Sequence, residues 1–190
     1  MATFRMTEHC FTVLIDHLNG NAKSSQKRFE PDTLVDGLFV TWTNGPKERL
    51  RGCIGSLSAL PLSRLSEFAI TSSQRDSRFL PIALPELPQL TCSVSILHSF
   101  EKCMHYKDWT VGVHGIVVEF TVNKRTFKAT FLPHVIPDQC WDQETAIESA
   151  CKKSGFHGNT TSIVSTIVVT RYQCSKSVLT HQEYVERQLQ

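Results

Sequence analysis

A chain of 190 residues with 41% hydrophobic and 20% charged residues has the composition of a single soluble globular domain with a well-buried core. Its formal net charge of +2 is too small to indicate, by itself, a nucleic-acid or anionic-membrane partner. The first residues contain no apolar run that could form a signal-peptide core, and no later segment approaches membrane-spanning length. We therefore expect an intracellular protein, cytoplasmic or nuclear or both, without a membrane partner.

The seven cysteines are expected to remain thiols. Their number is odd, their spacings are wide and no secretory segment is apparent, whereas disulfide frameworks are typical of small secreted domains. No CxxC pair occurs, and the spacing of His98, Cys103 and His105 matches no common zinc pattern. The sequence thus indicates no metal and identifies no cofactor.

The chain is predicted to open with a helix. Thr7 is a plausible N-cap, and Asn19-Gly20 supplies a stop signal. The helical stripe between them consists of Cys10, Phe11, Leu14 and Leu18. The polar segment over residues 21–33 that follows is predicted to be a loop.

A β-hairpin and a second helix are predicted next. Residues 38–42, LFVTW, alternate between two faces, and residues 48–54, ERLRGCI, are expected to pair with them across a turn at Asn44-Gly45-Pro46. The apolar spacing over residues 61–73, which begin with proline, predicts the helix.

Prolines at positions 81, 85 and 88 then favour an extended connection over residues 75–90. Three further strands are predicted over residues 91–97, 109–120 and 125–132. The last two are joined by a tight turn at Asn123-Lys124. This succession of strands indicates hairpins and not parallel crossover units.

The C-terminal part is predicted to contain two helices around one strand. The first helix begins at Trp141-Asp142 and ends at Gly155, and the second begins at the capping-box sequence from Thr180. The β-branched residues 162–172 predict the strand. Because helices and strands neither alternate strictly nor segregate, we expect an α+β fold with a mainly antiparallel sheet flanked by helices.

The segment LRGCIG, residues 50–55, places a thiol between two glycines. Strand alternation puts Arg51 and Cys53 on one face with Cα atoms about 6 to 7 Å apart, so that the guanidinium can lie near the sulfur and favour its thiolate. Gly52 and Gly55 would allow a ligand to approach the backbone, or would permit an anion-binding turn. The alternative is a buried thiol, with the glycines marking a bulge or tight packing.

Other candidate residues can also be explained either by a functional role or by a structural one. His98, His105, His114 and His134 all follow Cys53 in the chain. His114 is the most suggestive general base because glycines flank it, although a turn histidine bonded to solvent explains the same pattern. In the segment RDSRF, Asp76 and Arg78 form either a salt-bridged helix end or an anion-recognition loop.

Six segments occur in order between about Leu34 and about Tyr172: LRGCIGSL, DSRF, CSVSIL, VGVHGI, ATFLPHV and WDQ. Together they resemble the AMMECR-domain family, and the C-terminal TRYQ and EYVE segments are similar to its eukaryotic-type members. The resemblance implies one AMMECR-type domain over residues 1–190. It also implies that a larger and a smaller part of an α+β fold enclose a cleft beside the RGCIG segment.

The resemblance covers several positions besides Cys53. The matching residues are Arg51, Gly52, Ile54, Gly55, Asp76, Arg78, His114, Gly115, Pro133 and Trp141. The sequence departs from the family pattern at PDQCW, where Cys140 precedes Trp141 in place of a small or glycine-rich stretch.

The family has no settled activity, and some microbial relatives are fused to Memo-like and radical-SAM domains, which hints at a modification pathway. One hypothesis is an enzyme with Cys53 as thiolate nucleophile or redox thiol, Arg51 as its electrostatic partner and His114 as base. Backbone N–H groups around Gly52 and Gly55 would then stabilise an anion. Another is a protein-interaction adaptor that docks through residues 81–88 or the basic hairpin. Nucleic-acid binding is more weakly supported. The partner, a small molecule or a protein, is not identified by the sequence.

Overall fold

The structure, a computed structural model, describes residues 1–21, 29 and 33–189, so most of the predicted loop over residues 21–33 lies outside the described residues. The chain groups into two compact units, one of Met1–Leu97 with Ser175–Gln190 and one of His98–Cys174. No helix in the described ranges has the length and apolar character needed to cross a bilayer. A single domain over residues 1–190, and a cleft enclosed by its two parts, stay predictions.

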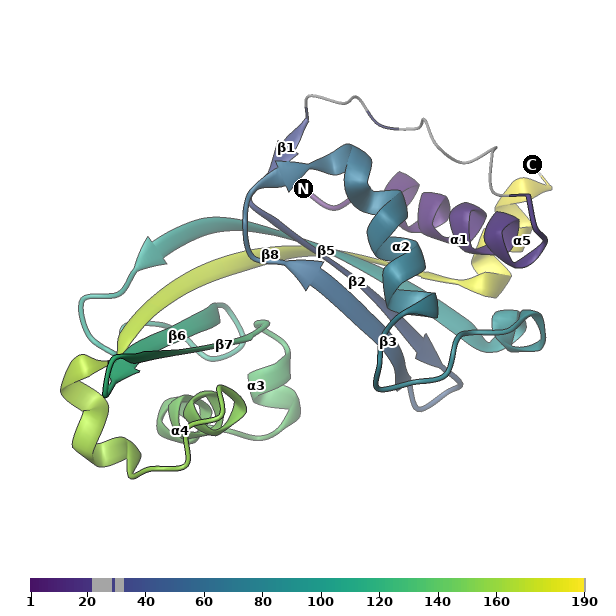
Figure 1. Cartoon of the computed structure of the whole chain (residues 1–190). Coiled ribbons are helices and arrows are strands. Elements are labelled where there is room, and N and C mark those ends of the chain that lie inside the picture. Colours follow the sequence, from purple (N-terminus) through teal and green to yellow (C-terminus); the bar gives the residue numbers. More distant parts are fainter. Residues whose placement is uncertain (22–28, 30–32, 190) are drawn as a thin grey trace. The chain divides into compact units, whose positions relative to one another are not determined.

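Six of the described strands form one antiparallel sheet (Figure 1), and two short strands pair in a separate sheet. The strand order of the six-stranded sheet is β3-β2-β5-β8-β6-β7. The strands are β2 (Gly37–Asn44), β3 (Arg49–Ser56), β5 (Leu90–Lys102), β6 (Gly115–Val122), β7 (Arg125–Phe131) and β8 (Val168–Thr180). β2 pairs antiparallel with β3 and β5, and β6 pairs antiparallel with β7 and β8. The α+β class with a mainly antiparallel sheet is confirmed.

The first unit places its helices on one face of β2, β3 and β5 (Figure 1). These are α1 (Phe4–Leu18), α2 (Leu65–Gln74) and α5 (His181–Gln188), and the short elements are β1 (Leu34–Val35), β4 (Leu60–Pro61) and the 3₁₀ helices η1 (Leu62–Arg64) and η2 (Leu84–Gln89). Leu38, Val40 and Trp42 of β2 are fully buried in this core. The Trp42 indole donates to the Ser72 hydroxyl of α2 over 3.1 Å, which satisfies its buried N–H.

The second unit has its own core, formed by β6 and β7 together with α3 (Val135–Asp138), α4 (Gln143–Lys153) and the 3₁₀ helix η3 (Thr160–Thr166). Asp142 caps α4, because its side chain accepts the Thr145 N–H over 2.8 Å. Asn123 and Lys124 have φ of 49° and 64°, which is the backbone of a primed hairpin turn. The predicted helix over residues 141–155 and the predicted turn are both confirmed.

Several predicted boundaries are wrong, for local physical reasons. α1 begins at Phe4, and Thr7 lies inside it with its hydroxyl donating to the Phe4 carbonyl over 2.9 Å. Residues 109–114 form turns before β6, and the proline-rich connection includes η2. Much of the segment predicted as a strand over residues 162–172 is η3, since Asn159 caps a 3₁₀ helix there by accepting the Thr161 N–H.

Gly52 is essential for the packing of α2 on β3. A methyl group at this position would overlap the Ser72 backbone carbonyl oxygen, and neither backbone can move without disturbing the core. We expect Gly52→Ala to lower the free energy of unfolding by about 3 kcal/mol, measured by urea denaturation.

Gly20→Ala is the matched control, because Gly20 has φ of 74° and nothing within 4 Å of the added methyl group. The Gly20→Ala variant should lose about 1 kcal/mol of the free energy of unfolding, from backbone strain alone. Equal losses for the two variants would contradict the close packing of α2 on β3.

Candidate functional site at Cys53

A β-bulge lies next to Cys53 in β3. Trp42 pairs with Gly52, whereas Thr43 pairs with Leu50, so Arg51 has no residue opposite it. The strict alternation predicted for residues 50–54 is therefore interrupted at Arg51. The bulge re-aims the Arg51 side chain, as bulges commonly do at the edges of sheets.

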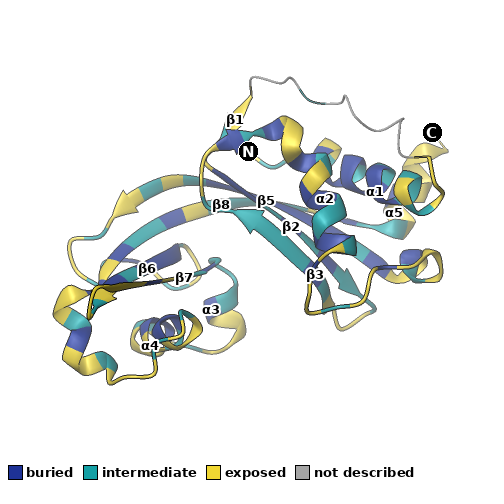
Figure 2. Cartoon of the chain, in the orientation of Figure 1, coloured by how far each residue is buried: buried dark blue, intermediate teal, exposed yellow. Residues whose placement is uncertain are grey.

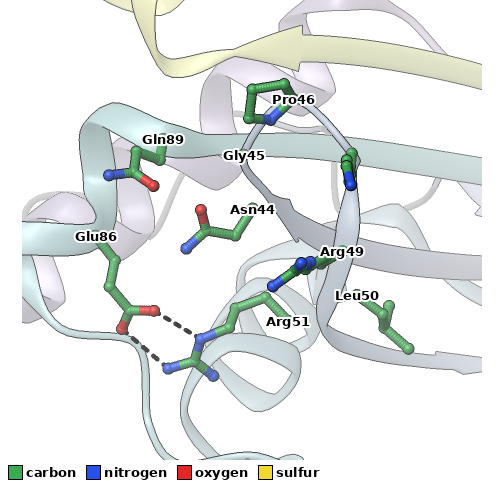
Figure 3. A pocket seen from close by; sticks show the side chains of 9 residues that line it. Asn44, Gly45, Pro46, Arg49, Leu50, Arg51, Glu86 and Gln89 are labelled. Atoms are coloured by element: carbon green, nitrogen blue, oxygen red, sulfur yellow. Dashed lines mark hydrogen bonds and ion pairs between the residues drawn. The ribbon is translucent and has the colours of Figure 1, made fainter.

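The Arg51 guanidinium binds residues of the connection that follows α2. Nε and one terminal nitrogen donate to the two carboxylate oxygens of Glu86 over 2.7 and 2.9 Å (Figure 3). The terminal nitrogens also donate to the carbonyls of Leu80 and Pro81 over 2.6 and 3.2 Å. The pairing with Arg51 holds the pKa of Glu86 below its usual range. Arg51 as the electrostatic partner of the Cys53 thiol stays a prediction.

Asp76 and Arg78 bind the main chain of Cys53 at the outer edge of the sheet. The Cys53 N–H donates to the Asp76 carboxylate over 2.9 Å, and Arg78 donates to the Cys53 carbonyl over 3.1 Å. Arg78 also donates to Asp76 over 2.6 and 2.9 Å. Because β3 is an edge strand, these side chains satisfy the groups that a further strand would otherwise bind.

The Asp76–Arg78 ion pair keeps both of its side chains charged beside the edge strand β3. The hydrogen-bonded Arg78 guanidinium, aided by the Cys53 N–H, holds the pKa of the buried Asp76 carboxyl well below its usual range. Asp76 in turn raises the pKa of Arg78, and a smaller Coulomb interaction with the Cys53 side chain acts in the same direction. The cation that contacts the Cys53 main chain is therefore Arg78.

The Cys53 side chain lies on the sheet face opposite the helices. Gly52 and the paired Trp42 face α2, so the next pair, Cys53 and Thr41, faces away. The Thr41 hydroxyl donates to Sγ of Cys53 over 3.1 Å. Thr41 also pairs with Ser93 of β5, so three strands present a row of one thiol and two hydroxyls. Figure 2 shows β3 largely in the intermediate burial class.

The two glycines of the motif have packing roles. Gly52 accommodates the Ser72 carbonyl, and Gly55 accommodates the ring of Phe39, its partner on β2. Both lie within β3, and neither is among the described glycines with positive φ. The anion-binding turn considered for these residues is therefore not formed, and their contact with a ligand stays a prediction.

The remaining predicted residues lie in the second unit. His114 is half-buried in the turn before β6, and its Nδ1 accepts the Thr110 N–H over 3.0 Å. In the neutral ring this leaves the proton on Nε2. Trp141 packs edge-on against Phe131, and Cys140 is an exposed residue with φ of 55°. His114 as the base for Cys53 stays a prediction.

Thr41, Ser93 and Glu86 were missed by the sequence analysis. Strand alternation could have placed Thr41 and Ser93 on one face, but the register of three strands decides that they lie in one row with Cys53. Glu86 carried no signal that linked it to Arg51, because the two residues are separated by 35 positions.

Comparisons with known proteins agree on one family. The AMMECR1 family model matches residues 7–177. An uncharacterised protein of Arabidopsis thaliana is 41% identical, over 97% of this chain and 88% of its own length. An uncharacterised protein of Schizosaccharomyces pombe is 36% identical, over 93% and 92%. The crystal structure of an uncharacterised protein from Pyrococcus horikoshii is similar with a TM-score of 0.71 and 26% identity, covering 92% of this chain and 91% of that one.

The ion pair at Cys53 makes a prediction for acid stability. A carboxyl whose folded pKa is lowered stabilises the fold above its unfolded pKa of about 3.9, and this stabilisation is lost as the pH falls through the lower folded value. We expect Asp76→Asn to reduce the free energy of unfolding at pH 7 by about 2 kcal/mol. The difference between wild type and variant should shrink below about pH 4 in urea denaturation.

Asp138→Asn, at an exposed position, is the control and should follow the wild-type pH profile. A constant difference between Asp76→Asn and wild type from pH 7 to pH 2 would show that the Asp76 charge does not stabilise the fold.

Proposed function

The chain belongs to the AMMECR1 family, and we propose that its functional group is the Cys53 thiol, acting as a nucleophile toward an electrophilic substrate. The observation that carries this proposal is the hydrogen bond from the Thr41 hydroxyl to Sγ, 3.1 Å long. A donor aimed at sulfur stabilises the thiolate more than the thiol, because hydrogen bonds to charged groups are the stronger ones. The thiolate is the nucleophilic form of cysteine.

The charge around Cys53 supports the same proposal. Arg78 binds the Cys53 carbonyl and interacts electrostatically with the thiol. Its own position is held by two hydrogen bonds to Asp76. A cation near a sulfur favours the thiolate, and the paired Asp76 carboxylate reduces this effect, so that the Thr41 hydrogen bond is the principal contact that stabilises the thiolate.

The surface beside the thiol suits a polar substrate. Thr41, which donates its one O–H to Sγ, keeps an oxygen that can accept a hydrogen bond from a substrate, and the buried Ser93 lies behind it in the row. The Phe39 ring, packed on Gly55, supplies an apolar contact two residues along β3 from Cys53. We infer a small polar molecule or an extended peptide as the substrate class.

Thr41→Val tests the hydrogen bond with little change of shape. Without the hydroxyl donor, the pH midpoint of Cys53 alkylation should rise by about one unit. The rate at neutral pH should fall accordingly. The measurement is iodoacetamide labelling of the folded protein across pH 5 to 10, with each cysteine read separately by peptide mass spectrometry.

Thr43→Val is the matched control, because Thr43 lies on the same strand and the same face but next to the bulge. It should leave the Cys53 midpoint unchanged, and Cys140, an exposed thiol, serves as the reference within the same sample. A Cys53 that labels no faster than Cys140, or a midpoint that Thr41→Val does not move, would count against the proposed nucleophile.

A second candidate function, a protein-interaction adaptor, is favoured by exposed apolar side chains after α2. Leu80 is 83% exposed and Leu84 is 45% exposed, on the connection that Arg51 holds in place. Partner binding by an adaptor should survive Cys53→Ser and be lost in a Leu80→Ser, Leu84→Ser double variant. The opposite result would favour the thiol-based function.

A further inference from the structure

A cavity of about 590 Å³ lies at the tip of the β2–β3 hairpin, separate from the row that contains Cys53. Its polar lining consists of Asn44, Lys47, Arg49, Arg51, Glu86 and Gln89 (Figure 3). Leu50 and Pro46 add apolar surface. The volume is within the range of about 300 to 1,000 Å³ that is usual for small-molecule sites.

The charge of this cavity is not balanced. Its one carboxylate, Glu86, forms a two-bond pair with Arg51. Within residues 33–189, neither Lys47 nor Arg49 forms an ion pair. The nearby Glu48 lines a neighbouring cavity instead of this one. Two cations are thus available to an anion that enters the cavity, and an anion would relieve the repulsion between them.

The walls of the cavity are fixed before any ligand binds. The Gly45 N–H donates to the Gln89 carbonyl over 3.0 Å, which ties the hairpin tip to η2. The Arg51–Glu86 pair ties β3 to the same 3₁₀ helix, and both partners are mostly shielded from solvent. Fixed walls reduce the ordering cost that a ligand would otherwise have to offset.

The chemistry of the lining identifies a ligand class. A guanidinium presents two parallel N–H donors that match the oxygens of a phosphate or a carboxylate, whereas Lys supplies a point charge. The amides of Asn44 and Gln89 can bind hydroxyl or further oxygen groups, and Leu50 can contact a short carbon skeleton. We propose that the hairpin cavity binds a small molecule carrying a phosphate or carboxylate group, with Arg49 as its main contact. This site is independent of the proposed function of Cys53.

The test is calorimetric titration of the full chain at low ionic strength with two probes, pyrophosphate and citrate. Saturable binding of either probe with a dissociation constant below about 1 mM is expected, and the tighter of the two identifies the favoured oxyanion. Arg49→Gln, a substitution at an exposed position, should weaken binding about tenfold. Lys47→Gln should weaken it less.

Lys124→Gln, at the tip of the β6–β7 hairpin, is the matched control and should bind as wild type does, as should Cys53→Ser. No saturable binding of either probe, or equal weakening by Lys124→Gln and Arg49→Gln, would overturn the site. Tighter binding of a single-stranded RNA oligonucleotide with steep salt dependence would also overturn it, in favour of a nucleic-acid surface.

Discussion

The close contact between the Ser72 carbonyl of α2 and the main chain of Gly52 determines how the rest of the first unit is arranged. Because no side chain separates them, the end of α2 lies directly on β3 and the chain leaves the helix at the sheet edge. The next residues, Asp76 and Arg78, are thereby positioned to bind the N–H and carbonyl of Cys53. The sequence analysis considered Gly52 as a contact for a ligand. In the structure, Gly52 instead allows α2 to bring the Asp76–Arg78 ion pair to Cys53.

Three arginines of this region have three different roles. The role of each depends on whether a carboxylate is paired with it. Arg78 is paired with Asp76 and acts at the edge of β3. Arg51 is paired with Glu86 and fixes the connection after α2. Arg49, two residues before Arg51, lines the hairpin cavity without such a pair in the described chain. Charge that is already neutralised stabilises structure, whereas charge that is not neutralised is available to bind a ligand.

The Cys53 row and the hairpin cavity are both consequences of the bulge at Arg51. Beyond the bulge, Cys53 and Thr41 lie on the face opposite the helices. Before the bulge, Leu50 and Arg49 line the cavity, and Arg51 turns toward Glu86. One extra residue in one strand therefore separates a thiol surface from a cationic one. This explains how two chemically different surfaces arise within a single eight-residue strand.

The sequence by itself determined the elements whose signals are local. Alternation in β2 predicted its buried face, and Asp142 and Thr180 predicted the starts of two helices, because caps and strand periodicity depend on neighbouring residues. The residues of LRGCIG also identified the region of the candidate site. Only the tertiary structure decided what surrounds Cys53: the register across β3, β2 and β5 selected Thr41, and α2 delivered Asp76 and Arg78. Contacts between residues far apart in the chain depend on packing and register, which no short pattern of residues encodes.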